Sequence, residues 1–370
     1  MGNVDSRCKH EHGYLMVQTA KQIYYPGEVV TGTVYLRTHV ALEVSYIELE
    51  VQGKEKVSFV TREHRDNEWH HDKHKSKKIL WQFKQPCFTF SVPTLAPGDY
   101  AVPFSFALPP HIPSSLYYKN KHIDAKPKAC VKYQMRASLI DHHHHSQMKY
   151  KTIMVIREHD VQFEVGRKTT SELPISTWCC INQGQSRIEV DFEKNVFEPH
   201  EVCRANVNLD NSRCNVRLTN VRLAVEQVVR ITAGWHTFNQ TFTLSDKHEA
   251  GVPANHSTPE LRHLELPLSS ITYQVEGQRK KGGHMKSICA EDLYMMKQMQ
   301  PACHGHHITN EYFLAVRCGF EGCTCCATLP HARIPISIVP VVNPQFASFS
   351  QPTDFAPQYY QQYDFQVKMQ

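Results

Sequence analysis

The sequence has no long apolar run. Across its 370 residues no stretch approaches the roughly 20 consecutive apolar residues that a membrane-spanning helix needs, and no apolar secretory signal follows the first residues. Charged residues make up 21% of the chain and hydrophobic residues 41%, which is typical of a globular protein. At this length the composition favours two domains.

Motifs that carry enzyme chemistry are missing as well. The chain contains no Gly-rich phosphate loop, no His-Glu-x-x-His pattern and no Gly-x-Ser-x-Gly nucleophile elbow. Its 24 histidines and 13 cysteines offer many Cys–His combinations, but no spacing selects one of them. We therefore expect a protein that is not an enzyme and that holds no cofactor. The net charge of +5 is too small to suggest a nucleic-acid partner.

The amino terminus fits a lipidation pattern. Residues 1–6, Met-Gly-Asn-Val-Asp-Ser, match the Met-Gly-x-x-x-Ser/Thr sequence that directs myristoylation of Gly2. Cys8 follows between Arg7 and Lys9 and is a candidate for palmitoylation, which would supply the second signal that stable anchoring requires. The alternative is an unmodified start with a surface thiol.

A turn followed by a strand is the clearest structural signal. In residues 24–36, Pro26 and Gly27 predict a turn, after which the side chains alternate with the period of two typical of a strand. The pattern returns at Pro199, which lies 173 positions after Pro26 (199 − 26). Short alternating strands and turn signals fill the rest of both halves, with few helical stripes. The sequence therefore predicts an all-β fold of two tandem antiparallel immunoglobulin-like β-sandwiches.

The first half resembles the amino-terminal domain of the arrestin superfamily, and it is most similar to the α-arrestins, also called arrestin-domain-containing proteins. The segments that carry the resemblance are YPGEV at 25–29, GTV at 32–34, PGDY at 97–100, PFSF at 103–106 and LP at 108–109.

The second half resembles the arrestin carboxy-terminal domain. Its opening turn at residues 197–202 fits, although His200 stands where the family usually has glycine. Residues 311–318 and 333–338 resemble the closing hairpin of that domain. The resemblance covers roughly residues 14–340.

These patterns divide the chain into five expected segments. They are an acylation segment at 1–12, an arrestin-like N-domain at 13–165, an interdomain linker at 166–182, an arrestin-like C-domain at 183–342 and a flexible tail at 343–370.

Three segments depart from the strand pattern. Residues 61–78 are polar and rich in His and Lys, and we expect a long hairpin loop there. An insertion at 274–308 carries a basic loop at 278–283 and a helix at 290–299. The loop is either solvated or, if the chain is acylated, in contact with lipid headgroups. The tail from residue 343 has no strand period and is rich in Pro, Gln and Tyr.

The resemblance implies a non-catalytic cytosolic adaptor in membrane-protein trafficking, endocytosis and signalling. Its expected partners are the cytoplasmic regions of membrane receptors or transporters, sorting machinery, and the surface of the plasma membrane or endosomes, reached through acyl groups on Gly2 and Cys8. Family members dock on WW domains through Pro-Pro-x-Tyr motifs, but residues 109–112 (PPHI) and 356–359 (APQY) each lack part of that motif. An alternative is a retromer-type arrestin-fold sorting subunit with a stable large partner.

A metal-binding or redox-responsive module is the alternative from another class. Cysteines cluster near an expected turn at 319–322, and a Cys/His group precedes them; the residues are Cys318, Cys323, Cys325, Cys326, Cys303, His304, His306 and His307. Four such ligands suffice for structural zinc. However, only one CxxC spacing is present, and neighbouring strand residues point to opposite faces. We therefore expect no metal site.

Overall fold

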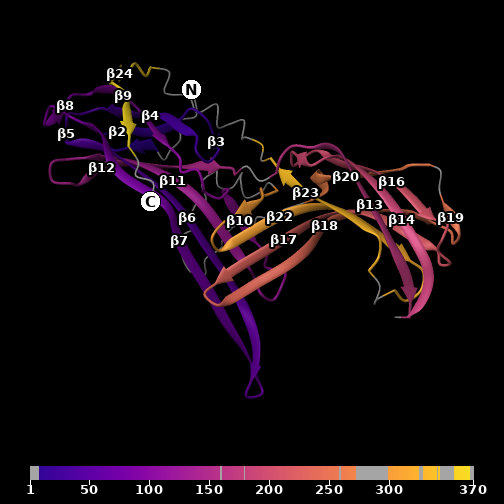
Figure 1. Cartoon of the computed structure of the whole chain (residues 1–370). Helices are drawn as coiled ribbons and strands as arrows, with labels where there is room; N and C mark the ends of the chain where they lie inside the picture. Colours follow the sequence, from indigo (N-terminus) through magenta and orange to yellow (C-terminus); the bar gives the residue numbers. More distant parts are fainter. Residues whose placement is uncertain are drawn as a thin grey trace.

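The computed structural model describes residues 8–158, 161–178, 180–257, 260–271, 299–324, 328–339, 341 and 354–366. It confirms the all-β prediction of two sandwiches in tandem, one at the upper left and one at the right of Figure 1. Gly2, the basic loop at 278–283, residues 290–298 of the expected helix, Cys325 and Cys326 lie outside the described residues. Within those ranges, no helix has the length and apolar character to cross a bilayer.

Two facing sheets build the first sandwich. The strands are β1 (Lys9–His10), β2 (Gly13–Thr19), β3 (Ile23–Tyr24), β4 (Val29–Thr38), β5 (Leu42–Glu43), β6 (Tyr46–Arg65), β7 (Glu68–Thr89), β8 (Thr94–Leu95), β9 (Gly98–Ala107), β10 (Leu116–Lys119), β11 (Lys128–Ile140) and β12 (Ser146–Ile156). One sheet has the order β1-β2-β4-β9 and the other β3-β12-β11-β6-β7, with β10 beside β11 and a separate β5–β8 pair.

The second sandwich repeats this design. The elements are β13 (Val165–Thr177), β14 (Ile181–Lys194), β15 (Val196–Phe197), β16 (Val202–Asn211), β17 (Leu218–Ala233), β18 (His236–Val252), β19 (His256–Ser257), β20 (Arg262–Pro267), the 3-10 turn η2 (Leu268–Ser270), β21 (Cys303–His304), β22 (Ile308–Phe320) and β23 (His331–Ile338). One sheet has the order β13-β14-β16-β19, with β20 also on β16, and the other β15-β23-β22-β17-β18, with β21 on β22.

The duplicated turn is visible in the side chains. Lys21 Nζ lies 3.2 Å from Glu28 Oε1, and the Tyr25 amide donates to the same carboxylate at 3.0 Å. In the second sandwich, Lys194 and Glu201 form the equivalent pair at 2.6 Å. The short strands before the two turns, β3 and β15, both run parallel to the last strand of their sandwich, β12 and β23. The repeat inferred from Pro26 and Pro199 is therefore structural.

The polar segment at 61–78 is not a loop, as the sequence analysis expected. Strands β6 and β7 pair without a break in that segment as far as Arg65 and Glu68, and Asp66 and Asn67 close the hairpin with φ angles of 50° and 63°. Two consecutive residues with positive φ fit the tight turn that suits the strand twist. The hairpin extends beyond the other strands at the bottom of Figure 1.

The expected linker and the expected flexible tail are also strands where the structure describes them. The described residues of 166–182 belong to β13, the turn after it and the start of β14, because β13 pairs with β14 in the second sandwich. Residues of the tail form β24 (Gln358–Tyr359) and β25 (Tyr363–Phe365), and both pair with β9 of the first sandwich. Neither segment could be predicted as a strand from the sequence, because the strands with which each one pairs are known only from the three-dimensional structure.

Each sandwich has an apolar core, and the first core crosses the domain boundary. Val229, Ile231 and Ala233 of β17 and Ile308 of β22 pack with the residues of the first sandwich. The β17–β18 hairpin therefore lies against the β6–β7 hairpin, as Figure 1 shows.

Candidate functional site

The edge of β9 is the first candidate site, because the chain's own tail occupies it. Gln358 and Tyr359 pair with Tyr100 and Ala101, and the Tyr360 amide donates to the Ala101 carbonyl at 2.9 Å. Further along, β25 continues beside β9 as far as Phe106. Both segments run parallel to β9, so backbone hydrogen bonds hold an extended peptide on an open sheet edge.

A charged cluster holds the tail at Asp354. The Arg37 guanidinium of β4 donates to both carboxylate oxygens of Asp99 at 2.6 and 2.8 Å and to both of Asp354 at 3.1 Å. The Ala356 amide also donates to Asp99, at 2.9 Å. The hydrogen bonds from Arg37 lower the pKa of the Asp99 carboxyl, and the hydrogen bond to Asp99 raises the pKa of Arg37. The ring of Phe355 lies 5.3 Å from the Arg37 guanidinium.

Aromatic side chains pack the following part of the tail against the first sandwich. Phe365 is buried, and its ring centroid lies 5.0 Å from that of Phe83 on β7. The ring of Tyr360 lies 4.1 Å from that of Phe88 and stacks on Tyr100. By contrast, Tyr359 of β24 is 64% exposed. The edge of β9 thus combines backbone pairing, the positive charge of Arg37 and aromatic contact positions, which together are the elements of a peptide-binding site.

The junction between the two sandwiches is the second candidate site, and a buried carboxylate holds it together. Glu55 of β6 is fully buried and accepts hydrogen bonds from three successive backbone amides of the second sandwich. The amides belong to His306 at 3.0 Å, His307 at 2.8 Å and Ile308 at 2.9 Å. These bonds supply the polar partners that a buried carboxylate requires.

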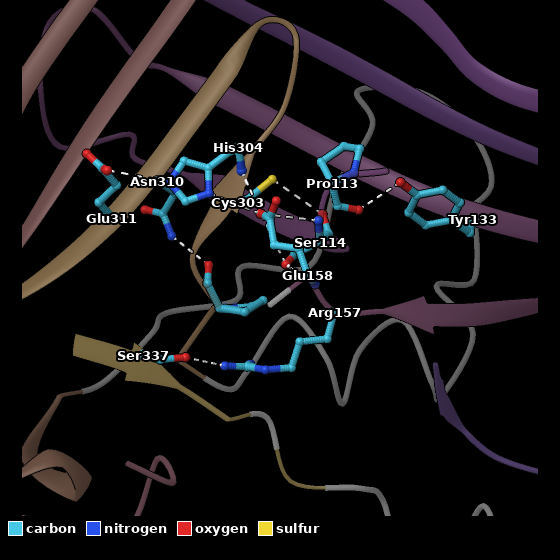
Figure 2. A network of polar contacts seen from close by, with 11 residues as sticks. Pro113, Ser114, Tyr133, Arg157, Glu158, Cys303, His304, Asn310, Glu311 and Ser337 are labelled. Carbon is cyan, nitrogen blue, oxygen red and sulfur yellow. Dashed lines mark hydrogen bonds and ion pairs between the residues drawn. The ribbon is translucent and has the colours of Figure 1, made fainter. Parts of the chain in front are cut away.

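A histidine between two carboxylates lies nearby, as Figure 2 shows. His304 Nδ1 is 3.4 Å from Glu158 and its Nε2 is 3.4 Å from Glu311, while the His304 amide donates to Glu158 at 2.7 Å. The hydrogen bond to Glu158 is the main cause that raises the pKa of His304 from 6.5 to about 9. The imidazole is therefore protonated at neutral pH and carries a positive charge between the sandwiches.

The junction also includes an arginine and a cysteine. Arg157 donates to the Ser337 hydroxyl at 2.6 Å and to the carbonyl of Ile338 on β23. Cys303 is fully buried, and its sulfur lies 3.3 Å from the Ser114 carbonyl. Burial is the main cause that raises the pKa of the Cys303 thiol well above its usual value, which makes it a poor nucleophile.

Comparison with known families agrees with this architecture. The model of the family "Arrestin (or S-antigen), N-terminal domain" matches residues 15–162, and that of "Arrestin (or S-antigen), C-terminal domain" matches residues 182–343. The chain belongs to the arrestin superfamily. It is similar to "Arrestin domain-containing protein 17" of Caenorhabditis elegans, with 22% identity over 271 residues, which are 70% of this chain and 62% of that protein. The chain thus covers less than two thirds of that relative. The resemblance to the arrestin superfamily and its arrestin-domain-containing members is confirmed.

The expected lipid-attachment residues are only partly placed. Gly2 lies outside the described residues. Both versions of the sequence prediction placed Cys8 at the surface. In the structure Cys8 is instead 0% exposed and packs in the core of the first sandwich. Modification of the Cys8 thiol therefore requires that the segment before β2 leave the core.

The described members of the cysteine and histidine cluster lie in different parts of the second sandwich and at the junction. Cys318 is buried within β22, Cys323 is half-buried beyond its end, and Cys303 lies at the junction. Burial raises the pKa of the Cys318 thiol to about 12. Among the residues that the structure describes, no three His, Cys, Asp or Glu side chains form a group that could hold a metal ion.

The sequence analysis missed Glu55 and Arg37, which lie at the centre of the two candidate sites. Glu55 carried a usable signal, because it occupies an interior position in the alternation that runs from Leu49 and Val51 to Val57. A charged residue at such a position predicts a buried polar contact. Arg37 carried no comparable signal, since its partner Asp354 is 317 positions away.

Proposed function

We propose that this protein is a non-catalytic adaptor in membrane-protein trafficking that captures an extended peptide along the edge of β9. The observation that carries the proposal is that the chain's own residues 358–359 and 363–365 occupy this edge as parallel strands. A surface that binds one extended segment through backbone bonds and a few side-chain seats suits other segments of the same pattern.

The side chains that contact the tail indicate which residues a bound peptide should contain. An acidic residue would meet Arg37, as Asp354 does, and an aromatic residue would pack on Phe83, as Phe365 does. A cytoplasmic segment of a receptor or transporter with this spacing would compete with the tail. Captured cargo would then be sorted or internalised together with the adaptor.

Membrane association would raise the local concentration of the adaptor near such cargo. We place it in the cytoplasm, at the plasma membrane or endosomes, held by a myristoyl group on Gly2. A palmitoyl group on Cys8 would strengthen the anchoring but requires the thiol to leave the core.

In cells, Gly2→Ala is expected to move the protein from membranes to the soluble fraction; Cys8→Ser is the companion variant. An unchanged distribution of Gly2→Ala would contradict the myristoyl anchor.

The peptide site is tested with the tail itself. A labelled peptide of residues 354–366 is titrated into the chain truncated after residue 353 and into the full chain. We expect binding to the truncated chain and weaker binding to the full chain, in which the tail competes. A peptide with Asp354→Asn and Phe365→Ala is the matched control and is expected to bind less tightly. Equal binding of the two peptides, or no binding to the truncated chain, would overturn the proposal.

A further inference from the structure

The β6–β7 hairpin has two different faces, which follow from its register. Directly paired residues of an antiparallel ladder share a face. Lys56 pairs with Lys77, Ser58 with Lys75, Val60 with Lys73, Arg62 with His71 and His64 with Trp69. These positions therefore line one face of the hairpin from its base to its tip.

The opposite face is occupied by the second sandwich. This opposite face of the hairpin includes Phe59, whose ring lies 6.3 Å from that of Phe238. It also includes His74, whose ring stacks on that of His236 with centroids 3.8 Å apart. Lys78 Nζ on the same face contacts His306 at 3.0 Å. Because this side packs against β17–β18 and the junction, only the first face is presented to a partner.

The outward face is strongly basic. On β7 it carries Lys73, Lys75 and Lys77, which are all exposed, and none of its register positions from Lys54 to Trp69 holds an acidic residue. Burial and the nearby ammonium groups of Lys77 and Lys56 lower the pKa of Lys54, in keeping with a crowd of like charges.

The same face continues onto the neighbouring strands. On β11, Lys132 pairs with Lys54 and Lys128 pairs with Ser58, so both belong to it. On β12, Lys151 pairs with Arg136 of β11. Acidic side chains meet this face at two places: the Asp124 carboxylate lies 3.2 Å from Arg62, and toward the far end of β6 Glu50 lies 2.9 Å from Arg136. We call the outward face of β6, β7, β11 and β12 the basic face.

An exposed tryptophan ends the basic face at the hairpin tip. Trp69 is 58% exposed, and the Arg62 guanidinium lies 4.7 Å from its ring. The His64 ring lies 5.0 Å away on the same face. A large apolar ring with a polar N–H group beside cationic side chains suits the headgroup region of a bilayer.

We infer that the basic face docks on an anionic lipid surface, with Trp69 inserted at the level of the headgroups. Lysines spread over several strands suit a broad layer of negative charge, and the face extends about 33 Å along β6 from Lys54 to His64 at about 3.3 Å per residue. Apart from Trp69, the outward-facing hairpin positions from Lys54 to Trp69 hold no Phe, Tyr or Trp on which nucleic-acid bases would stack. This inference goes beyond the proposed peptide capture, because it uses a different surface from the edge of β9.

The test uses the full chain without acyl groups and vesicles of phosphatidylcholine with or without phosphatidylserine. We expect binding that requires phosphatidylserine and weakens as salt is added. The variant Lys56→Gln/Lys75→Gln/Lys77→Gln is expected to lose on the order of 100-fold in partitioning, since each basic residue near an anionic surface contributes about fivefold. Circular dichroism verifies that the variant is folded.

Two matched controls separate the basic face from general charge and from exposed tryptophan. Lys168→Gln/Arg217→Gln/Lys247→Gln removes the same charge from exposed positions of the second sandwich and is expected to bind nearly as the wild type does. Trp69→Ala is expected to weaken binding several-fold, whereas Trp235→Ala, at the fully exposed tip of β17–β18, is expected to leave it unchanged.

Three results would overturn the inference. They are equal losses in the two triple variants, equal losses in the two tryptophan variants, or binding of a phosphopeptide or a short nucleic acid without binding to vesicles. The peptide titration at β9 does not depend on this face, so failure of one proposal is distinguishable from failure of the other.

Discussion

Arg37 and Asp354 meet across 317 positions of sequence, with Arg37 Nη1 3.1 Å from both carboxylate oxygens of Asp354. The contact holds the tail to β4, which is the neighbour of β9, the strand with which the tail pairs. Because Asp99 binds the same guanidinium, Arg37 is already oriented when the tail arrives, and little side-chain entropy remains to be lost.

We expect Arg37→Gln to loosen the tail. Hydrogen bonds between charged groups contribute about 1.5–3 kcal/mol, so amide hydrogen exchange in residues 354–366 should accelerate by on the order of 10-fold or more. Hydrogen–deuterium exchange with mass spectrometry measures this. Arg136→Gln, which removes an exposed ion pair with Glu50, is the matched control and should leave the tail unchanged. Equal exchange in the two variants would show that Arg37 does not hold the tail.

A second prediction concerns the aromatic seat. Phe365→Ala should cost about 2 kcal/mol of tail docking, because a buried phenyl ring is lost. Tyr359→Ala in β24 should cost little, since its side chain is 64% exposed. Proteolysis of the tail under native conditions reports the difference. A tail that is equally protected in both variants would mean that the backbone ladder alone retains it.

The junction should depend on the charge of Glu55. Glu55→Gln replaces an acceptor of three backbone amides with a neutral group that directs an NH₂ toward some of them. We expect a loss of about 2–3 kcal/mol in the free energy of unfolding, measured with urea. Glu321→Gln, at an exposed site, should change this free energy by less than about 0.5 kcal/mol. Similar stabilities for the two variants would contradict the role of Glu55.

His304 should make the junction sensitive to alkaline pH. Folding raises the pKa of His304 from 6.5 to about 9, so its stabilising contribution is complete below pH 6.5 and declines as pH rises through about 9. The stability difference between the wild type and His304→Gln should therefore be largest near pH 6 and small near pH 10. Urea unfolding at several pH values measures it. A difference that grows with pH would have the wrong sign for this mechanism.

Local patterns predicted much of the fold from the sequence. The turns at Pro26 and Pro199 and the alternation that follows them depend on neighbouring residues, so the sandwiches and the duplication could be anticipated. The hairpin at 61–78 was read as a loop because both of its faces are polar, although one face packs against the second sandwich. The tail strands could not be predicted, because Asp354 and Phe365 acquire their roles only beside Arg37 and Phe83.

The shared core limits how the chain can be divided. Val229, Ile231 and Ala233 of β17 complete the interior of the first sandwich, although they belong to the second half of the sequence. A gene fragment that stops at the family boundary after residue 162 would therefore lack part of its own interior and would present an apolar surface prone to aggregation. The two halves, although related by duplication, are no longer interchangeable or separable units.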